Sequence, residues 1–362
     1  MEMNDIFRTP TLPGFSPTGK DGDVVLVSFV RLARNFRQLP FPGRAGFQQL
    51  QAVASMAASL QGDLENAFGE SFDLIDMNAI TPLEREVLAE KHLVSQSFLQ
   101  NPQYRLVLVS QDRRISVMVN EDDHLRIQGQ APGLDLNTPL EAVSKVDDTV
   151  ESRQDMAFDE DFGYLTACPT NLGTGLRASV LLHLPGLVYT RNMNNIINIS
   201  PQLGLAVRGL YGDDREVVGN IFIMSNQLTL GFSEKEIIDN LKSAVTEIIA
   251  HERRARKAIE LYRKDRLADD VWRAYGILRY ARYLSQKEAL ELISKVRLGM
   301  DMHLIDEVDE KCYDGLLIGG RTSFLQNAAG SDNMSGAEVD KLRADMVRRI
   351  LMAYRAEGRT GA

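Results

Sequence analysis

The pattern of apolar residues changes at Ser233, from short strand-like runs before it to helical spacing after it. Ser233-Glu-Lys-Glu236 has the form of a capping box, in which a hydroxyl and a glutamate three residues later satisfy free amides at a helix N-terminus. Ser285-Gln-Lys-Glu288 repeats this signal. After the first box, apolar residues recur on one helical face: Ile237, Ile238, Leu241, Val245, Ile248 and Ile249. The chain therefore divides into a strand-rich part and a helical part.

The apolar runs before Ser233 are short and rich in β-branched residues, which is typical of strands. Tyr104–Ser110 and Ile115–Asn120 flank a polar turn and predict a hairpin. Four more runs predict strands and one has helical spacing: Val24–Val30, Val180–Leu184, Leu205–Gly209, Asn220–Asn226 and Gln48–Leu60. We expect an α+β fold with a mainly antiparallel sheet flanked by helices, followed by an all-α C-terminal domain. The expected divisions are an irregular lead-in (1–23), a sheet-containing domain (24–254) and a helical domain (255–362).

Composition excludes some classes of function. The 362 residues carry a formal net charge of −9, which disfavours general affinity for nucleic acid or for an anionic membrane. No run of about 18 apolar residues is present to span a bilayer. Cys168 and Cys312 are the only cysteines, too few for a disulfide framework, and the first residues lack the apolar core of a secretory signal. We expect a cytoplasmic protein.

The segment Cys168-Pro-Thr-Asn-Leu-Gly-Thr-Gly-Leu-Arg-Ala178 is the strongest candidate for a site. Its arginine offers a charged fork suited to phosphate, its cysteine can act as a thiolate, and its glycines allow close approach of a ligand. The segment also fits the dinucleotide pattern G-x-G-x-x-A, but Pro169 before it and Pro185 soon after it disfavour the required strand and helix. The segment therefore predicts a site for an anionic ligand.

Other segments place charged residues at the ends of predicted strands. Asn120-Glu-Asp-Asp-His-Leu-Arg126 could hold a metal, another cation or a guanidinium group, or could form only an acidic turn. Ser28–Arg34 and Arg208–Glu216 supply arginines that could meet phosphates, or could be solvated strand ends. His92 lies between apolar residues, a position that fits packing as well as function.

Taken in chain order, these segments resemble the ATP:guanido phosphotransferases, the family of creatine and arginine kinases. The resemblance rests on Asn120–Arg126 and Cys168–Arg177, with Val217–Phe222 and Ser225-Asn226 extending it. The resemblance implies that residues 24–254 form a phosphagen-kinase-like catalytic domain. The helical C-terminal part resembles that of bacterial protein-arginine kinases, and the N-terminal helical domain of creatine-type members has no counterpart.

The resemblance implies ATP with Mg²⁺ and a set of site residues. ATP phosphates need several cations, because phosphoryl transfer proceeds mainly by positioning and charge stabilisation. Asp122 and Asp213 would grip the acceptor guanidinium, one of them as base, and Cys168 would help to position it. No protein-bound metal site is implied. The residues implied at the nucleotide are Ser28, Arg31, His92, Arg126, Arg177, Ala178, Ser179, Arg208 and Gly209.

Four positions depart from the family pattern. Asp122 and Asp213 stand where the family has the longer glutamate, and Phe29 stands where it has a phosphate-binding arginine. Val339 replaces the first arginine of a regulatory phosphoarginine-binding motif, of which Asp340 and Arg343 are kept. A misplacement of about 1 Å at a reacting group costs on the order of 10²-fold in rate, so these changes bear directly on activity.

Three functions follow from these observations. The first is ATP-dependent phosphorylation of arginine side chains in proteins. The second is a catalytically impaired kinase that binds nucleotide or partner proteins as a regulatory scaffold. The third is a kinase for a small guanidino compound, which the missing N-terminal domain disfavours. By resemblance, we expect a homodimer in the stress response, with a zinc-binding activator protein, a heat-shock repressor and the Clp chaperone–protease as partners.

Overall fold

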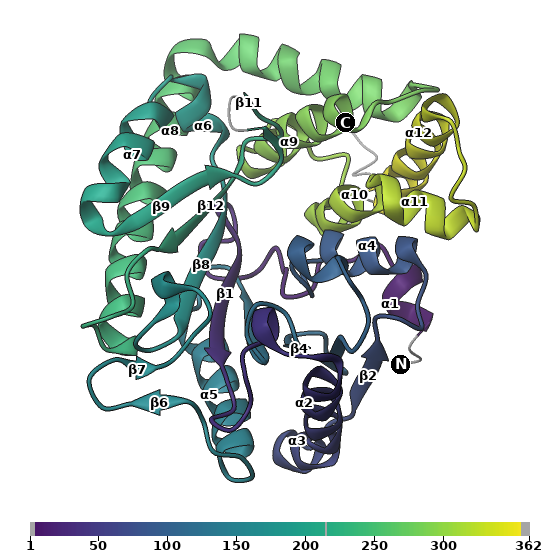
Figure 1. The fold of residues 1–362 in the computed structure, drawn as a ribbon. Helices are drawn as coiled ribbons and strands as arrows, with labels where there is room; N and C mark the ends of the chain where they lie inside the picture. The colour runs from purple at the N-terminus through teal and green to yellow at the C-terminus, as the bar shows by residue number, and fades with distance from the viewer. Residues whose placement is uncertain (1–3, 214–215, 356–362) are drawn as a thin grey trace.

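The computed structural model describes residues 4–213 and 216–355, and an eight-stranded sheet forms its centre (Figure 1). All neighbouring strands in this sheet pair antiparallel. The spatial order is β2 (Phe72–Asp76), β3 (Leu106–Ser110), β4 (Ile115–Val119), β5 (Leu125–Pro132), β1 (Val25–Arg34), β8 (Leu176–His183), β12 (Ile221–Asn226) and β9 (Leu205–Gly209). The predicted α+β class with an antiparallel sheet is confirmed.

Helices cover both faces of the sheet and create two cores. One core packs the sheet against the first half of α8 (Glu234–Tyr280) and against α2 (Phe47–Ser59), α3 (Gln61–Phe68) and α5 (Asn137–Glu151). The other core holds the second half of α8 together with α1 (Asn4–Arg8), α4 (Pro82–Glu90), α9 (Gln286–Asp301), α10 (Tyr313–Gly319), α11 (Thr322–Ala329) and α12 (Gly336–Ala353). The helical C-terminal part is thus confirmed, and it shares one sheet face with α4.

The remaining elements are short and lie mostly at the ends of the sheet strands. Two hairpins stand apart from the main sheet, β6 (Phe158–Asp159) with β7 (Gly163–Tyr164), and β10 (Gly212–Asp213) with β11 (Glu216–Val217). Two short helices, α6 (Pro185–Tyr189) and α7 (Met193–Ile199), follow β8. None of the helices among the described residues is both long and apolar enough to cross a membrane.

Alternation along β1 sends its side chains into different cores. Val30 and Leu32 belong to the core with α5, whereas Phe29 belongs to the core with α4 and the C-terminal helices. Arg34 lies on the α5 side, where its Nε and Nη2 donate to Asp147 at 2.6–2.9 Å. This arginine, which the sequence offered as a phosphate ligand, is therefore a buried partner of a helix carboxylate.

The capping signals of the sequence are confirmed, because the hydroxyls of Ser233 and Ser285 accept hydrogen bonds from backbone amides three residues later. Helix α8 continues for 47 residues and passes through the boundary expected at residue 254. Arg263 interrupts it with non-helical backbone angles (φ −145°, ψ 24°). The lead-in, expected to be irregular, contains α1, which packs against α4 and α11.

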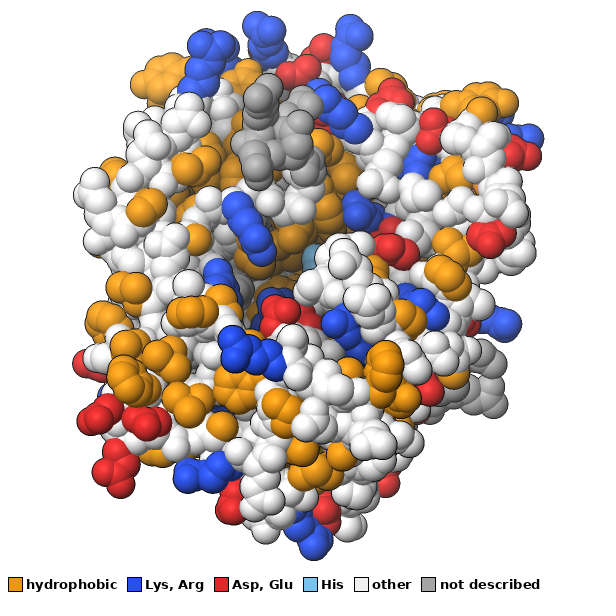
Figure 2. Space-filling model, viewed as in Figure 1, with side chains coloured by type: hydrophobic (Ala, Val, Ile, Leu, Met, Phe, Trp, Pro, Cys, Tyr) orange, Lys and Arg blue, Asp and Glu red, His pale blue; other side chains and the backbone are white. Residues whose placement is uncertain are grey.

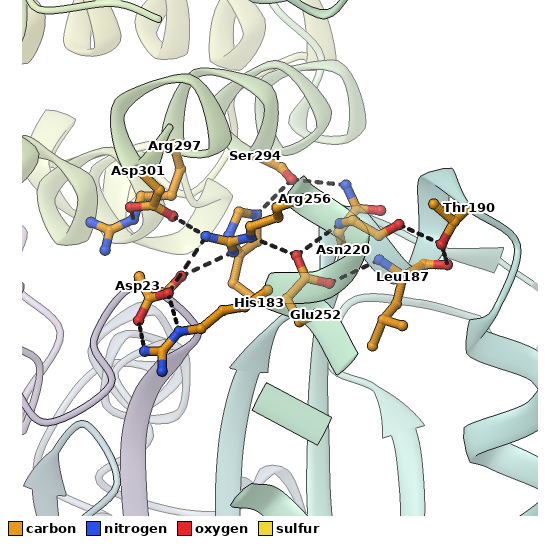
Figure 3. Close-up of polar contacts among 12 residues, drawn as sticks. Asp23, His183, Leu187, Thr190, Asn220, Glu252, Arg256, Ser294, Arg297 and Asp301 are labelled. Atoms are coloured by element: carbon orange, nitrogen blue, oxygen red, sulfur yellow. Dashed lines mark hydrogen bonds and ion pairs between the residues drawn. The ribbon is translucent and has the colours of Figure 1, made fainter. Parts of the chain in front are cut away.

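A buried polar network joins the sheet end to α8 and α9 (Figure 3). Glu252 of α8 accepts hydrogen bonds from the backbone amides of Gly186 and Leu187, at 2.9 and 2.8 Å, and from Arg256 Nε at 2.7 Å. Arg256 Nη1 in turn donates to Asp301 of α9 at 3.1 Å. These charges are removed from water but paired, the arrangement that buried ions require.

The same network reaches the sheet through Ser294 of α9. Its Oγ lies 2.8 Å from Nε2 of His183 and accepts a hydrogen bond from Asn220 at 2.8 Å. Burial lowers the pKa of His183 well below its ordinary value, and the charges of Arg256 and Arg297 lower it further. His183 is therefore a neutral structural residue that fixes α9 against β8.

Candidate functional site

Four arginines from four different strands share the sheet face that carries Phe29. Arg31 of β1 lies directly opposite Arg177 of β8, and Arg126 of β5 pairs in register with the residue two places after Arg31. Arg208 lies on the edge strand β9, and it acts electrostatically on both Arg31 and Arg177. We call Arg31, Arg126, Arg177 and Arg208 the arginine cluster. Figure 2 shows this side of the molecule hollowed, with Lys and Arg side chains around the hollow.

The arginine cluster favours an anion. Burial and the charges of the other three arginines together lower the pKa of Arg31 to about 9, although the charge of Glu121 opposes this shift. Arg31 Nε donates to the neutral amide oxygen of Gln128 at 2.6 Å, and Arg177 Nη2 lies 3.5 Å from the hydroxyl of Ser225. Because these partners carry no negative charge, a bound polyanion would relieve the repulsion between the arginines.

His92 lies beside the cluster, just after α4. Its backbone adopts a positive φ of 57°, and its carbonyl accepts a hydrogen bond from Gln128 at 2.6 Å. Burial and, to a smaller extent, the charges of Arg31 and Arg321 together lower the pKa of His92 to about 4, so the imidazole is neutral. Its Nε2 is buried and, among the described residues, has no hydrogen-bond partner. A polar ligand in the hollow could supply that partner.

Glu121 connects the arginine cluster to a second feature, an acidic turn. Burial by itself would raise the pKa of Glu121, but Arg126 and hydrogen bonds from Arg126, Ser95 and Ser97 bring it to about 2. Arg126 Nη1 lies 2.5 and 2.6 Å from the two carboxylate oxygens. Glu121 is therefore a fixed anion that orients Arg126 and is not free to hold a metal.

Asp123 brings the acidic turn and the cysteine segment together. Its Oδ1 accepts hydrogen bonds from Asn35 Nδ2 and from the backbone amide of Ala167, both at 2.6 Å. Burial raises the pKa of Asp123 above its ordinary value, and these two hydrogen bonds only partly oppose the shift. Since Ala167 precedes Cys168 and Asp123 follows Asp122, the hydrogen bond from Ala167 joins the acidic turn, with its exposed Asp122, to the segment that carries Cys168.

A cavity of about 1300 Å³ opens in front of this pair. Asp122 and Cys168 both line it, together with Glu121 and the aromatic side chains of Phe47 and Tyr104. Cys168 is partly exposed, and its Sγ lies 3.0 Å from the hydroxyl of Thr170. Arg44 and Arg105 also line the cavity, and the guanidinium of Arg105 donates to backbone carbonyl oxygens. The exposed carboxylate of Asp122, the thiol and the aromatic walls suit a cationic planar group such as guanidinium.

The glycines of the cysteine segment serve packing between chain segments. A Cβ on Gly175, where φ is +66°, would lie 2.7 Å from the carbonyl oxygen of Ala33 and from Nη1 of Arg34. A Cβ on Gly173, where φ is +106°, would lie 2.9 Å from Cα of Leu230. Close approach is thus required at both positions, but the approaching atoms belong to the protein.

Some residues implied at the nucleotide lie away from the cluster face. Ser28 is fully buried, and its hydroxyl donates to the carbonyl oxygen of Gly133 at 2.7 Å. Ala178 is also fully buried, on the α5 side of the sheet. Ser179 is on the cluster side, opposite Phe29. At Gly209 a Cβ would lie 2.5 Å from the side chain of Val217, so contact with the β10–β11 hairpin already requires a glycine there.

The second implied carboxylate, Asp213, is described by the structure only in its backbone. Asp213 ends β10 and pairs with Glu216, but its side chain and residues Asp214 and Arg215 lie outside the described part of the structure. Its role therefore stays a prediction.

The regulatory pair lies in α12, apart from the arginine cluster. Arg343 is buried and donates to the carbonyl oxygens of Gly320 and Leu284, to the Asp340 carboxylate and to the Thr322 hydroxyl. Its guanidinium is thus engaged by the protein itself. Binding of phosphoarginine by Asp340 and Arg343 stays a prediction.

Phe29 places an aromatic ring on the same face of β1 as Arg31. It is 2% exposed, and its ring meets that of His92 edge-on, with centroids 6.1 Å apart. The guanidinium carbon of Arg31 lies 5.9 Å from the centroid of the Phe29 ring. Phe29 therefore packs against two residues of the site and limits how far they can move.

Sequence reasoning included Glu121 only as one carboxylate of Asn120–Arg126, and it did not single out Gln128 or the two serines that bind Glu121. Gln128 could have been found, because it lies two residues after Arg126 on the same strand face. Ser95 and Ser97 could not, because only the tertiary fold brings them to the acidic turn.

The described residues contain no group of three or more His, Cys, Asp or Glu side chains placed to hold a metal. Of the three carboxylates in the acidic turn, Glu121 is paired with Arg126 and Asp123 accepts two hydrogen bonds, which leaves Asp122. Mg²⁺ commonly binds through one or two carboxylates plus substrate phosphates and waters. The site thus fits a magnesium ion that arrives with a nucleotide.

Comparison with family models accounts for most of the chain. Residues 54–255 match the model of the ATP:guanido phosphotransferase C-terminal catalytic domain. Residues 264–361 match the model of the protein-arginine kinase McsB C-terminal domain. Residues 256–263, between the two matches, lie within α8 and end at its interruption, Arg263.

Curated relatives match over nearly the whole length. The protein-arginine kinase of Desulforamulus reducens is 42% identical over 353 residues, covering 97% of this chain and 98% of that protein. The protein-arginine kinase of Bacillus cereus (strain B4264) is 42% identical over 352 residues, covering 97% and 99%.

Solved structures support the fold. Taurocyamine kinase from Schistosoma mansoni, with bound transition-state analogue components, aligns with a TM-score of 0.57 at 24% identity, covering 69% of this chain and 35% of that one. Lombricine kinase aligns with a TM-score of 0.56 at 23% identity, covering 68% and 71%.

Proposed function

Because the chain belongs to the ATP:guanido phosphotransferase family and is similar to protein-arginine kinases along nearly its whole length, we propose that it phosphorylates arginine side chains in proteins. ATP is the donor and a guanidinium nitrogen is the acceptor. The observation that carries this function is the meeting of two features, the arginine cluster and the cavity with Asp122 and Cys168, joined by the Glu121–Arg126 ion pair.

The arginine cluster would bind the phosphates of ATP. Arg31, Arg126, Arg177 and Arg208 supply fixed positive charge in a partly buried place, where charge acts more strongly than in water. In phosphoryl transfer the enzyme mainly aligns the groups and stabilises charge. Mg²⁺ would be held by the ATP phosphates and by waters.

The acceptor guanidinium would enter the cavity lined by Asp122 and Cys168. It is protonated in water and must lose a proton to act as a nucleophile. As the nitrogen forms a bond to the γ-phosphorus, the bond from phosphorus to the β–γ bridging oxygen breaks, ADP leaves and a carboxylate accepts the proton. We assign this proton to Asp122, with Asp213 as the second carboxylate that orients the group.

The experiment is mass spectrometry of phosphoarginine on an arginine-rich protein incubated with ATP and Mg²⁺. The unaltered chain should produce phosphoarginine, and Asp122→Asn should lower its rate by about 10²–10⁴-fold, since a positioned base contributes that much. Asp112→Asn is the matched control, because Asp112 is a partly exposed aspartate in the β3–β4 turn. Equal rates for the Asp122→Asn variant and the unaltered chain would overturn the assignment of the base.

Two alternatives are separated by the same assay. An impaired kinase acting as a scaffold has no support in the comparisons, and formation of phosphoarginine by the unaltered chain would exclude it. A small-molecule guanidino kinase would phosphorylate free arginine faster than arginine in a protein.

Several finer features rest on the resemblance alone. They are a homodimer, a cytoplasmic location, a part in the stress response, and a zinc-binding activator protein, a heat-shock repressor and the Clp chaperone–protease as partners. Regulation through Asp340 and Arg343 belongs with them. Light scattering of the purified chain tests the dimer directly.

A further inference from the structure

The C-terminal helices approach the site through Arg321, the residue that precedes α11. The guanidinium carbon of Arg321 lies 4.5 Å from the centroid of the Tyr211 ring, and its Nε lies 3.8 Å from Oε1 of Glu90. The side chain of Arg321 is 17% exposed, and its Nε has no hydrogen-bond partner among the described residues. Arg321 is thus held by charge and by ring stacking, and the stacking depends on its planar shape.

Glu90 makes the contact rigid on the side of α4. Helix α11 has no capping bond from its own N-cap side chain, and the Glu90 carboxylate accepts hydrogen bonds from the backbone amides of Ser323 and Phe324, at 3.2 and 3.0 Å. A negative charge is favourable at a helix N-terminus. Glu90 is the last residue of α4, two places before His92. The C-terminal part therefore fixes the end of the helix that leads into His92.

Tyr211 makes the contact rigid on the other side. Its carbonyl oxygen accepts a hydrogen bond from the backbone amide of Val218 at 3.0 Å, which closes the base of the β10–β11 hairpin. Asp213 follows two residues later in that hairpin. The ring of Tyr211 packs against the core that contains the C-terminal helices, and burial raises the pKa of the Tyr211 hydroxyl. The orientation of Tyr211 thus sets where the hairpin leaves the sheet.

Resting on the proposed function, we propose that Arg321 is a positioning residue for phosphoryl transfer. By holding Tyr211 and Glu90 together, it fixes the chain that follows β9 and the turn with His92 relative to the arginine cluster. The effect of its charge on the pKa of His92 agrees with this proximity. The C-terminal helical part is then a component of the active site's geometry.

The test compares steady-state kinetics of Arg321→Gln, Tyr211→Leu and the double variant, with ATP and a protein substrate. Each single change should lower kcat/KM by about tenfold, because small misplacements of reacting groups are costly. The double variant should be no slower than the slower single variant, since both changes break one contact. Arg321→Lys should restore little, because an ammonium lacks the planar stacking surface.

Arg273→Gln is the matched control, because Arg273 is an exposed arginine of α8 paired with Asp269. Tyr211→Phe should lose less activity than Tyr211→Leu, since it keeps the ring. If Arg321→Gln fails to fold, Tyr211→Leu and Tyr211→Phe still test the contact from its other side. Unaltered kinetics in a folded Arg321→Gln variant, or single losses that multiply in the double variant, would overturn the positioning role alone. Absence of phosphoarginine with the unaltered chain would overturn the proposed function as well.

Discussion

Arg126 donates through one nitrogen to both carboxylate oxygens of Glu121, at 2.5 and 2.6 Å, across the turn from β4 to β5. Glu121 is almost fully buried, and hydroxyls of Ser95 and Ser97 complete its hydrogen bonds. The ion pair stands between the arginine cluster and the cavity with Asp122. Its geometry therefore helps to determine how the arginine cluster and the cavity face each other.

Glu121→Gln should destabilise the protein in a pH-dependent manner. The pKa of Glu121 is lowered from 4.5 to about 2 in the folded state, so its charged form stabilises the fold above pH 4.5, and this contribution is lost as pH falls from 4.5 to 2. A shift of this size corresponds to about 3 kcal/mol. Urea unfolding between pH 3 and pH 7 should show a difference between the two proteins that shrinks as pH falls. Glu260→Gln, in an exposed pair with Lys264, should show no such trend.

Arg177→Gln should weaken ATP binding and transfer. Arg177 is a member of the arginine cluster, and loss of a charge-assisted contact costs about 1.5–3 kcal/mol, or on the order of 10–10²-fold. Isothermal titration with ATP and initial rates of phosphoarginine formation measure the two effects. Arg114→Gln is the control, because Arg114 is an exposed arginine on the β3–β4 turn. Identical titrations for both variants would contradict a phosphate role for Arg177.

Gly175→Ala should destabilise the fold more than Gly69→Ala. The two glycines have nearly the same φ, +66° and +69°, so the strain of a positive φ is matched. At Gly69 no heavy atom lies within 4 Å of the added Cβ, whereas at Gly175 the carbonyl oxygen of Ala33 lies 2.7 Å away. We expect a loss of about 1 kcal/mol at Gly69 and about 2–4 kcal/mol at Gly175. Chemical denaturation measures the free energy of unfolding of each variant. Equal losses would show that the backbone around Gly175 moves to accommodate the added Cβ, which would contradict this prediction.

Asp301→Asn should destabilise the junction between the sheet and the C-terminal helices. Asp301 lies 2.9 Å from Arg297 and 3.1 Å from Arg256, and removing its charge leaves two buried guanidinium groups under-compensated. Breaking a buried ion pair costs about 3–5 kcal/mol. The control Asp269→Asn breaks an exposed pair with Arg273 and should cost about 0–1 kcal/mol. Calorimetric unfolding measures the stability of both variants. A loss of stability in Asp301→Asn no larger than that in Asp269→Asn would contradict the stabilising role of the network.

Much of the fold could be predicted because its signals are local. The serine caps before α8 and α9 and the runs that became β3, β4, β9 and β12 depend on neighbouring residues only. Strand β2 was missed, because Phe72–Asp76 mixes apolar residues with two aspartates and is stabilised by pairing with β3. The length of α8 was missed as well, since no proline or glycine marks an end near residue 254.

The site was predictable in its residue types but not in its contacts. Arg31 and Arg34 look alike in the sequence, yet one belongs to the arginine cluster and the other is paired with Asp147 on the opposite sheet face. Successive strand residues alternate between faces, so strand register decides which arginine faces a ligand. The acidic turn divides in the same way, because Glu121 and Asp123 are taken up by protein partners and Asp122 alone is exposed.

The sequence by itself determined the α+β class, the helical C-terminal part and the segments from which the site is built, because capping, periodicity and motif spacing are properties of short stretches of chain. Only the tertiary structure decided that four arginines converge, that Asp123 joins the acidic turn to the cysteine segment, and that Arg321 contacts Tyr211. Ion pairs, stacking and burial depend on distances between segments far apart in the chain, and those distances exist only once the sheet register and helix packing are set.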